Sequence, residues 1–254
     1  MPMNRREFLT VSGSVAAGLM LPNPVRAEAA TGIKAVAFDG FTVFDPRPIA
    51  VLAESLFPGQ GQALAQTWRT RQFEYTWLRT LMGNYADFWQ VTAEALDFAV
   101  RQHHLDVSGE KRDRLLQSFL RLEPWPDAKE ALLQMKAAGL RLAFLSNFTA
   151  AMLDACVKHA GLEGIFEAHL STDRVRAFKP DPRAYQMGVD AFELPRAQIA
   201  FAAFGGWDAA GAKAFGYPTF WVNRVQAPLE NLGAAADATG ITLHELAVFV
   251  KHSA

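Results

Sequence analysis

The sequence lacks most of the features that mark disulfide-stapled, metal-bound or nucleic-acid-binding proteins. One cysteine, Cys156, stands among 254 residues, which excludes an intramolecular disulfide and a zinc site built from several cysteines. The six histidines show no metal-ligand spacing, and a formal net charge of −1 gives no overall positive field for nucleic acid. No internal repeat is present. Half of the residues are hydrophobic and a fifth are charged, which excludes wholesale disorder and fits a globular protein.

An apolar stretch near the N-terminus is too short to span a bilayer stably. Val11–Leu21 follows the pair Arg5 and Arg6 and precedes a small residue, Ala27, in the arrangement of a cleaved export signal. The run Asn4–Leu9 resembles the twin-arginine export motif. That resemblance implies a signal over residues 1–27, export of the folded chain by the twin-arginine machinery, and a periplasmic location. The alternatives are an N-terminal membrane anchor and a mobile tail.

Short apolar runs and helical patterns alternate along much of the remaining chain. The first run, Ile33–Asp39, is typical of a buried parallel strand that presents a carboxylate at its carboxyl end. Further strands are predicted at Arg141–Leu145, Ala168–Ser171, Ile199–Phe204 and Pro218–Val222. Helices are predicted between them, with Asp127 and Thr149 as N-caps of the first two. The alternation predicts an α/β fold with a doubly wound, Rossmann-like parallel sheet and a site at the strand carboxyl ends.

Residues 48–126 interrupt that alternation. Leu64–Leu81, Ala86–Arg101 and Lys111–Leu122 show helical patterns, and Pro124 and Pro126 mark their end. We therefore expect a helical cap, residues 48–126, inserted after the first strand of a core that comprises residues 31–47 and 127–254. A cap in this place would lie over the strand ends and exclude water from the site. An apolar face on the cap is compatible with a homodimer.

Residues capable of chemistry follow four of the predicted strands. They are Asp39, the pair Ser146 and Asn147, Lys179 and Asp208. Each has an ordinary alternative, because acids cap helices, Ser-Asn is a common turn pair and Lys-Pro-Asp forms surface turns. In this order, and with a helical insert after the first strand, the set resembles the haloacid dehalogenase-like superfamily. The resemblance spans essentially the whole chain after the predicted signal.

Further segments are similar to the L-2-haloacid dehalogenases within that superfamily. Trp68–Arg79 resembles their arginine-bearing cap helix, and Lys179–Asp181 with Tyr185, as well as Trp207–Ala212, also match. Phosphatases of the superfamily carry a second aspartate two positions after the nucleophile, as general acid and base. Here that position is Phe41, which neither transfers protons nor binds Mg²⁺. The resemblance implies a hydrolase of small 2-haloacids that needs neither metal nor cofactor.

The resemblance also implies a two-step displacement. Asp39 would displace halide from C2 of a 2-haloalkanoate to give an ester, and water would then attack the Asp39 carbonyl carbon and release a 2-hydroxy acid inverted at C2. Lys179 would keep Asp39 ionised and place its charge near the developing anion. Arg69 would bind the substrate carboxylate or the leaving halide, and Ser146 and Asn147 would bind the carboxylate by hydrogen bonds.

The other implied roles concern water, support and the pocket wall. Asp208 would orient the water, Tyr185 would support Asp39 or Lys179, and Thr42 would act beside the Asp39 carboxylate. The apolar wall around the alkyl group would consist of Phe41, Phe73, Phe88 and Trp207. Phe73 is an equal candidate for the core of the cap.

Two departures from the dehalogenase pattern bear on activity. The family's first motif, Asp-x-Tyr-Gly-Thr-Leu-Phe-Asp, is one residue shorter here, so Thr42 follows Asp39 by three positions rather than four. Ala203 and Gly205 stand where the family has a serine and an asparagine, so two hydrogen-bonding side chains are missing. Two alternatives therefore stay open. One is another hydrolase of the superfamily, such as a phosphatase, and the other is a non-catalytic periplasmic binding protein on a degraded dehalogenase scaffold.

Overall fold

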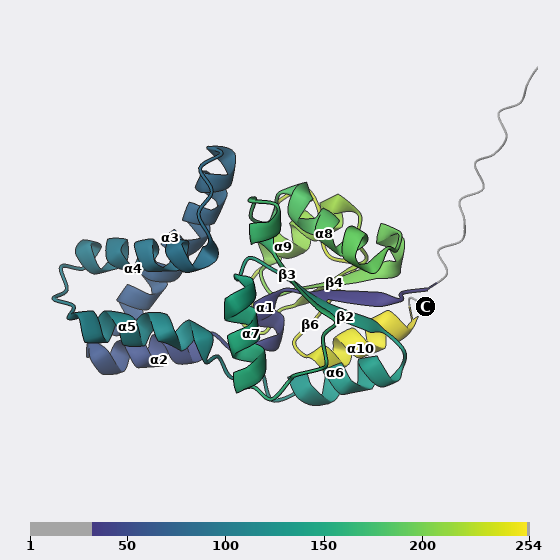
Figure 1. The fold of residues 1–254 in the computed structure, drawn as a ribbon, viewed down its shortest axis with the longest axis horizontal. Helices are drawn as coiled ribbons and strands as arrows, with labels where there is room; N and C mark the ends of the chain where they lie inside the picture. The colour runs from purple at the N-terminus through teal and green to yellow at the C-terminus, as the bar shows by residue number, and fades with distance from the viewer. Residues whose placement is uncertain (1–31, 253–254) are drawn as a thin grey trace, which may run out of the picture.

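A six-stranded parallel sheet forms the core of the molecule, in the order β3-β2-β1-β4-β5-β6 (Figure 1). The computed structural model describes residues 32–252, so the predicted signal at residues 1–27 lies outside the described residues. The strands are β1 (Ala35–Phe38), β2 (Arg141–Ser146), β3 (Ala168–Ser171), β4 (Ile199–Ala203), β5 (Thr219–Val222) and β6 (Ala238–Gly240). The chain runs outward from β1 to β3 and then crosses to the other side of β1, so the order reverses between β1 and β4. The predicted doubly wound parallel α/β fold is confirmed.

Helices cover both faces of the sheet, because alternate side chains of each strand point to opposite faces. In β1, Val36 and Phe38 belong to one apolar layer, and Ala35 and Ala37 belong to the other. The helices of the first layer are α6 (Ala128–Ala137), α7 (Ala150–His159) and α10 (Leu243–His252), and those of the second are α8 (Pro182–Phe192) and α9 (Gly206–Phe215). Every residue of β1 is buried, as expected of a central strand that is covered on both faces.

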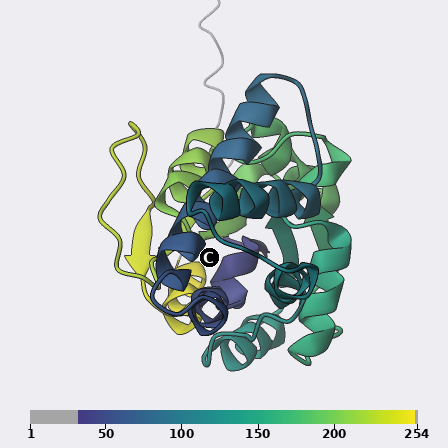
Figure 2. The same cartoon turned by 90° about the vertical axis from the view of Figure 1, so that its left-hand side faces the viewer.

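A separate layer of helices precedes β2 and lies beyond the carboxyl ends of the strands, to the left in Figure 1 and toward the viewer in Figure 2. After the short α1 (Gly40–Val43), this layer comprises α2 (Arg47–Leu56), α3 (Gly61–Leu81), α4 (Phe88–Gln102), α5 (Gly109–Gln117) and the 3₁₀ turn Ser118–Leu120. Gly61 lets α3 approach α2 closely, because a Cβ there would lie 2.2 Å from the Glu54 nitrogen. The helical insertion after the first strand is therefore present. Its limits as an independent domain, residues 48–126, stay a prediction.

The inserted helices are tied to the strand ends by polar contacts. The Phe178 backbone N–H, next to Lys179 in the chain, donates to Thr80 Oγ1 at the end of α3, over 3.1 Å. The Tyr85 hydroxyl, from the loop after α3, donates to the carboxylate of Asp173. These bonds hold the far end of α3 against the loop that follows β3. Side chains on α3 are thereby placed over the carboxyl edge of the sheet.

The first helix after the insertion is capped differently from our prediction. Asp127 precedes α6 as expected, but its backbone is already helical and its side chain makes no capping bond. Its carboxylate instead accepts from Arg224 Nη1 at 2.6 Å and from the Leu243 N–H at 2.6 Å. Thr149 does cap α7, because its extended backbone lets Oγ1 accept from the Met152 N–H at 3.1 Å.

Four elements are absent from the sequence prediction: α1, α2, β6 and α10. The helix α2 begins with a proline in its first turn and buries Ile49, Ala53 and Leu56 at helical spacing, so a signal was present. The helix α10 has no such proline, but it buries Leu243, Leu246 and Val250 at helical spacing, so a signal was present there too. By contrast, β6 is three residues long and has no apolar run. None of the helices in residues 32–252 combines the length and the apolar character needed to cross a membrane.

Candidate active site

Three charged side chains from different strand ends meet at the carboxyl edge of the sheet. Asp39 follows β1, Asp208 lies in the first turn of α9 after β4, and Lys179 lies in the loop before α8. Lys179 Nζ donates to Asp39 Oδ1 at 2.8 Å and to Asp208 Oδ2 at 2.6 Å. Because β1 and β4 are neighbouring parallel strands, their carboxyl ends open onto the same crevice. The structure thus brings together residues that lie up to 169 positions apart in the sequence.

Burial couples these three charges strongly. The side chains of Lys179 and Asp208 are 0% and 1% exposed, and that of Asp39 is 13% exposed. Burial alone would lower the pKa of Lys179, but the charges of Asp208 and Asp39 outweigh it, so this pKa lies above its ordinary value. Burial raises the pKa of Asp208 to about 6, with the Lys179 charge acting in the opposite direction. Lys179 is therefore a buried ammonium between two carboxyl groups.

Tyr185 supports Asp208 rather than Asp39 or Lys179, which corrects our expectation. Its hydroxyl donates to Asp208 Oδ1 at 2.7 Å, while the Tyr217 hydroxyl donates to the Tyr185 carbonyl oxygen at 2.5 Å. Burial and then the Asp208 charge raise the pKa of Tyr185 well above its ordinary value, so the phenol remains a donor. A Cβ at position 211 of α9 would lie 2.5 Å from the Tyr185 hydroxyl oxygen, which explains why this position is a glycine, Gly211.

The turn after β1 holds the Asp39 carboxylate by its backbone. The Phe41 N–H donates to Asp39 Oδ2 at 3.0 Å. The shorter motif left open whether the Thr42 hydroxyl reaches the Asp39 carboxylate; in the structure it donates to the Asp39 main-chain carbonyl at 2.6 Å. Thr42 lies in α1, three positions after the N-cap Asp39, where a threonine hydroxyl can reach the main-chain carbonyl of the residue three positions before it. Arg224 and Trp125, which the sequence did not single out, donate to the carbonyls of Thr42 and Phe41.

A cavity of about 20 Å³ lies over this group. Asp39, Arg69, Ser146, Asn147 and Asp208 line it, as do all four predicted wall residues. Those four are Phe41, Phe73, Phe88 and Trp207. Gly205, one of the two departures from the family pattern, also lines the cavity, and two further lining residues, Phe148 and Phe204, were missed. Phe148 directly follows the Ser-Asn pair and Phe204 directly follows β4, so their positions at strand ends could have identified them.

Ser146 and Asn147 keep hydrogen-bond donors available in the cavity. Ser146 Oγ accepts from the Phe148 N–H at 3.2 Å, and Asn147 Oδ1 accepts from the Lys179 N–H at 3.0 Å. Within residues 32–252, neither the Ser146 hydroxyl nor the Asn147 amide nitrogen donates to another protein group. Both side chains are nearly fully buried, at 1% and 4% exposure. They can therefore donate to an anion that enters the cavity.

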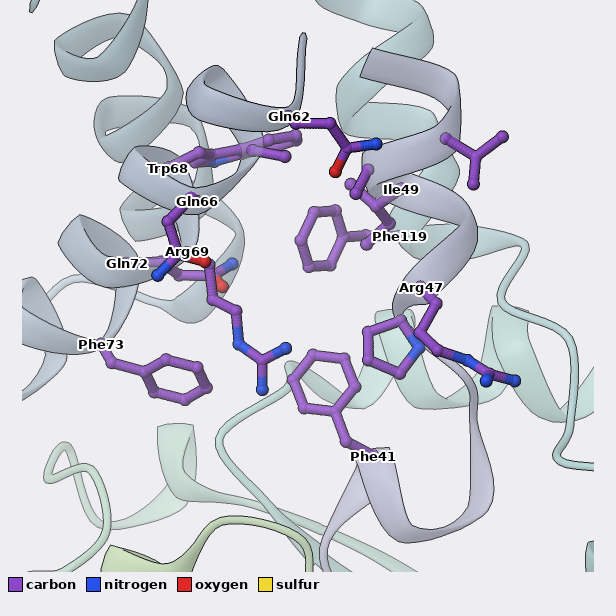
Figure 3. Close-up of a pocket in the computed structure, with 14 residues that line it drawn as sticks. Phe41, Arg47, Ile49, Gln62, Gln66, Trp68, Arg69, Gln72, Phe73 and Phe119 are labelled. Carbon is purple, nitrogen blue, oxygen red and sulfur yellow. The ribbon is translucent and has the colours of Figure 1, made fainter. Parts of the chain in front are cut away.

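Arg69 reaches the cavity from α3 in the inserted layer. No hydrogen bond or ion pair satisfies its guanidinium within the described part of the chain, although it lies over the rings of Phe204 and Phe73, at 5.5 and 6.0 Å. Figure 3 shows the group between the rings of Phe73 and Phe41. Arg69 is an exposed residue that lines two cavities, and desolvation by the surrounding protein lowers its pKa, opposed by the Asp39 charge. This unpaired cation suits an anionic ligand.

The missing family serine and asparagine are replaced by apolar packing. Ala203 is fully buried in β4. A Cβ at Gly205 would lie 2.8 Å from Trp207 Nε1, so the indole occupies the space that a side chain at position 205 would need. Phe73 and Trp77 from α3 pack against the same indole, with ring centroids 5.5 and 5.3 Å away. This side of the cavity is consequently a wall of aromatic rings.

The position between the two carboxylates is filled by an ammonium. Lys179 Nζ lies within hydrogen-bond distance of both Asp39 and Asp208. In the part of the chain that the structure describes, no group of three or more His, Cys, Asp or Glu side chains is arranged to hold a metal ion. The arrangement suits a carboxylate nucleophile held by a cation, in a pocket with donors for an anion.

Comparison with known proteins gives a consistent picture. The haloacid dehalogenase-like hydrolase family matches residues 28–216. The (S)-2-haloacid dehalogenase of Pseudomonas sp. strain YL is 41% identical over 206 residues, which cover 81% of this chain and 89% of that protein. Haloacetate dehalogenase H-2 of Moraxella sp. strain B is 40% identical over 208 residues, which cover 82% of this chain and 93% of that protein.

Solved structures agree with these sequence relatives. The L-2-haloacid dehalogenase from Xanthobacter autotrophicus with chloropropionic acid covalently bound superposes with a TM-score of 0.81 at 36% identity, over 87% of this chain and 100% of that one. Another L-2-haloacid dehalogenase of known structure has a TM-score of 0.85 at 41% identity, with the same coverage. The match in sequence over most of the chain, together with the fold, shows that this chain belongs to the haloacid dehalogenase-like hydrolase family.

Proposed function

We propose that this protein hydrolyses short (S)-2-haloalkanoic acids to (R)-2-hydroxy acids through an ester of Asp39. The observation that carries the proposal is a cavity lined by Arg69 and by two carboxylates, Asp39 and Asp208, that are both bonded to Lys179. A carboxylate nucleophile, an adjoining buried cation and free donors for a second anion are what displacement of halide from a 2-haloacid requires. Relatives at 38–41% identity are named (S)-2-haloacid dehalogenases.

In the first step, substrate binds with its carboxylate on the free donors. Ser146, Asn147 and the Arg69 guanidinium supply these donors, and Arg69 can instead receive the departing halide. A carboxylate oxygen of Asp39 attacks C2 from the side opposite the halogen. The new C–O bond forms as the C–halogen bond breaks, the halide leaves with the bonding electron pair, and C2 is inverted. Lys179, 2.8 Å from Asp39, keeps the nucleophile in place.

In the second step, water cleaves the ester. Asp208 lines the cavity and its pKa of about 6 suits a group that accepts a proton from water near neutral pH. The water oxygen attacks the Asp39 carbonyl carbon, the ester C–O bond breaks, and the 2-hydroxy acid leaves with the oxygen that first attacked C2. Asp39 returns as a carboxylate that carries an oxygen from water, and one proton is released for each halide. Tyr185 positions Asp208 through its 2.7 Å bond.

Halide release tests the proposal directly. We expect the protein to release chloride from (S)-2-chloropropionate in the presence of EDTA, and Asp39→Asn to abolish the reaction because an amide is a poor nucleophile. Hydrolysis of a phosphate ester that requires Mg²⁺, without halide release, would instead establish a phosphatase. Binding of 2-haloacids by the wild-type protein without any halide release would establish the binding-protein alternative.

We further propose that residues 1–27 direct the folded protein to the periplasm by the twin-arginine route. The support is the sequence motif around Arg5 and Arg6. Fusion of this segment to a reporter that is active only after export in the folded state provides the test. Replacement of both arginines by lysine should leave the reporter in the cytoplasm, and unchanged export of that variant would contradict the proposal.

We also propose a homodimer formed through the apolar end of α3. The support is exposure: Leu81 and Met82 are 84% and 66% exposed in the single chain. Light scattering on the mature protein should give twice the mass of one chain, and Leu81→Glu should halve it. A wild-type protein of single-chain mass at high concentration contradicts the dimer.

A further inference from the structure

A second and larger cavity adjoins the catalytic one. It measures about 380 Å³, against about 20 Å³ for the catalytic cavity, and lies between α2 and α3 (Figure 3). Phe41, Arg69 and Phe73 line both cavities. The two spaces therefore meet where the Arg69 guanidinium lies, and an occupant of one can extend into the other past that group. The larger volume is within the range of about 300–1,000 Å³ typical of ligand pockets, and the smaller is not.

The interior of the larger cavity is apolar. Ile49, Trp68 and Phe119 line it and are themselves buried, at 7%, 2% and 4% exposure. The Trp68 indole N–H donates to the Thr92 carbonyl at 2.7 Å, so the ring offers only hydrocarbon to the cavity. Pro46 and Ala50 continue the apolar surface. Such walls favour a hydrocarbon occupant over a polar one.

The polar lining residues are either committed elsewhere or exposed. The Gln72 amide donates to Thr92 Oγ1 at 2.6 Å. Arg47 is paired with Asp45 at 2.7 Å. Gln62 and Gln66 are both exposed, so they provide a polar edge rather than a binding group inside. Among the lining residues, the one charge left for a ligand is Arg69, at the junction with the catalytic cavity.

We infer that the larger cavity receives the hydrocarbon chain, from C4 outward, of longer 2-haloalkanoic acids whose carboxylate and C2 occupy the catalytic cavity. This inference rests on the proposed function and extends its substrate class from short acids to medium-chain ones. The small cavity has too little volume for a longer chain, and its shared lining residues, Phe41, Arg69 and Phe73, lead into the larger cavity. The acid then spans the junction, with its anionic end beside Arg69 and its chain against Ile49 and Phe119.

Chain length provides the first test. Bromide release is measured for (S)-2-bromo acids of three, four, six and eight carbons, and halogen-free propionate and hexanoate are compared as competitive inhibitors. A buried methylene is worth roughly a factor of four in affinity, so three additional ones are worth up to about 60-fold. We expect hexanoate to inhibit at least about tenfold more tightly than propionate, and kcat/KM for bromohexanoate to be at least equal to that for bromopropionate. A kcat/KM more than tenfold lower overturns the inference.

A cavity-filling variant provides the second test. Ala65 lies on α3, one turn before Arg69, and lines only the larger cavity. Ala65→Leu should lower kcat/KM for bromohexanoate at least about tenfold and leave that for bromopropionate within about twofold. Ala63→Leu, an exposed position on the same helix that lines neither cavity, is the matched control and should change neither.

The outcomes separate this inference from the function on which it rests. Equal losses on both bromo acids in Ala65→Leu would show a general disturbance of α3 and overturn the inference. Absence of bromide from every acid overturns the proposed function instead. In that case calorimetric binding of hexanoate and propionate still decides the role of the cavity. Hexanoate must bind more tightly, and Ala65→Leu must abolish the difference.

Discussion

The core and the inserted helices contribute charge to the site in opposite ways. In the core, Lys179 is fully buried and bonded to both Asp39 and Asp208, and Asp208 is also held by Tyr185. From the inserted layer, Arg69 lines the cavity beside Asp39 and Asp208, and among residues 32–252 it has ring contacts but no hydrogen-bond or ion-pair partner. A paired buried charge holds the structure together, whereas an unpaired cation in a cavity is available to a ligand. Substitution of Lys179 and substitution of Arg69 should therefore have different effects on stability and on activity.

Removal of Lys179 should have the largest effect, on folding and on activity together. Lys179→Met leaves two buried carboxyl groups side by side, so we expect a loss of about 3–5 kcal/mol in the free energy of unfolding. Halide release should fall by about 10²–10³ in the protein that remains folded. Urea denaturation and chloride assays measure the two quantities. A variant as stable as the wild type would show that the bonds of Lys179 to the two carboxylates do not stabilise the carboxyl edge of the sheet.

Removal of Arg69 should affect activity alone. Arg69→Gln deletes a charged donor for the substrate, worth about 1.5–3 kcal/mol, so kcat/KM should fall about 10- to 150-fold. The free energy of unfolding should change by less than about 0.5 kcal/mol, because no hydrogen bond or ion pair within the protein is lost. Arg71→Gln, on the same helix and paired with Glu74, is the control and should keep full activity. A large drop in stability for Arg69→Gln would remove the contrast with Lys179.

The pH dependence sharpens the contrast within the core. Asp208 is ionised above its pKa and protonated below it, so hydrolysis of the ester should fall as pH decreases. The Asp208 pKa is about 6 while Asp39 is ionised, and loss of the Asp39 charge in the ester places the acid limb of kcat below that value. The hydrogen bond from Tyr185 lowers this pKa, so Tyr185→Phe should move the acid limb of kcat to higher pH. The pH profile of halide release over many turnovers, recorded for the wild type and for Tyr185→Phe, measures the acid limb of each. An unmoved limb in Tyr185→Phe would separate Asp208 from the titrating group.

The smallest effect is expected at Thr42. Because its hydroxyl donates to a main-chain carbonyl and not to the Asp39 carboxylate, Thr42→Val should cost about 1 kcal/mol of stability. Activity should stay within about tenfold of the wild type. A loss of 10³ in kcat would show that the hydroxyl acts on the nucleophile during the reaction. Steady-state kinetics beside a thermal unfolding curve distinguish the two results.

The sequence was most informative about features that depend on a few adjacent residues. Buried apolar runs identified β1 and β4, because a central parallel strand must be apolar on both faces. The acids and the lysine at strand ends identified the trio, because parallel strands place their carboxyl ends on one edge. In each case the relevant information lies within a few adjacent residues.

Other features depend on side chains that are distant in the chain. That Tyr185 binds Asp208 follows from the packing of α8 on α9, and Gly211 shows its reason only once the Tyr185 oxygen is placed. The bond from the Thr42 hydroxyl to the Asp39 main-chain carbonyl depends on how the shorter motif folds into α1. The larger cavity arises between α2 and α3, and α2 itself was missed. No periodicity within a single segment encodes these relations.

The single lysine between two carboxyl groups also sets a charge balance over the reaction cycle. With both acids ionised, the group carries an excess of one negative charge, which would oppose the approach of an anionic substrate without Arg69. Once Asp39 is esterified, Lys179 and Asp208 form a neutral pair, and the Asp39 charge that raises the pKa of Asp208 is gone. Hydrolysis restores that charge. On the proposed reaction, the return of repulsion between the regenerated carboxylate and the bound hydroxy acid favours release of product from the cavity.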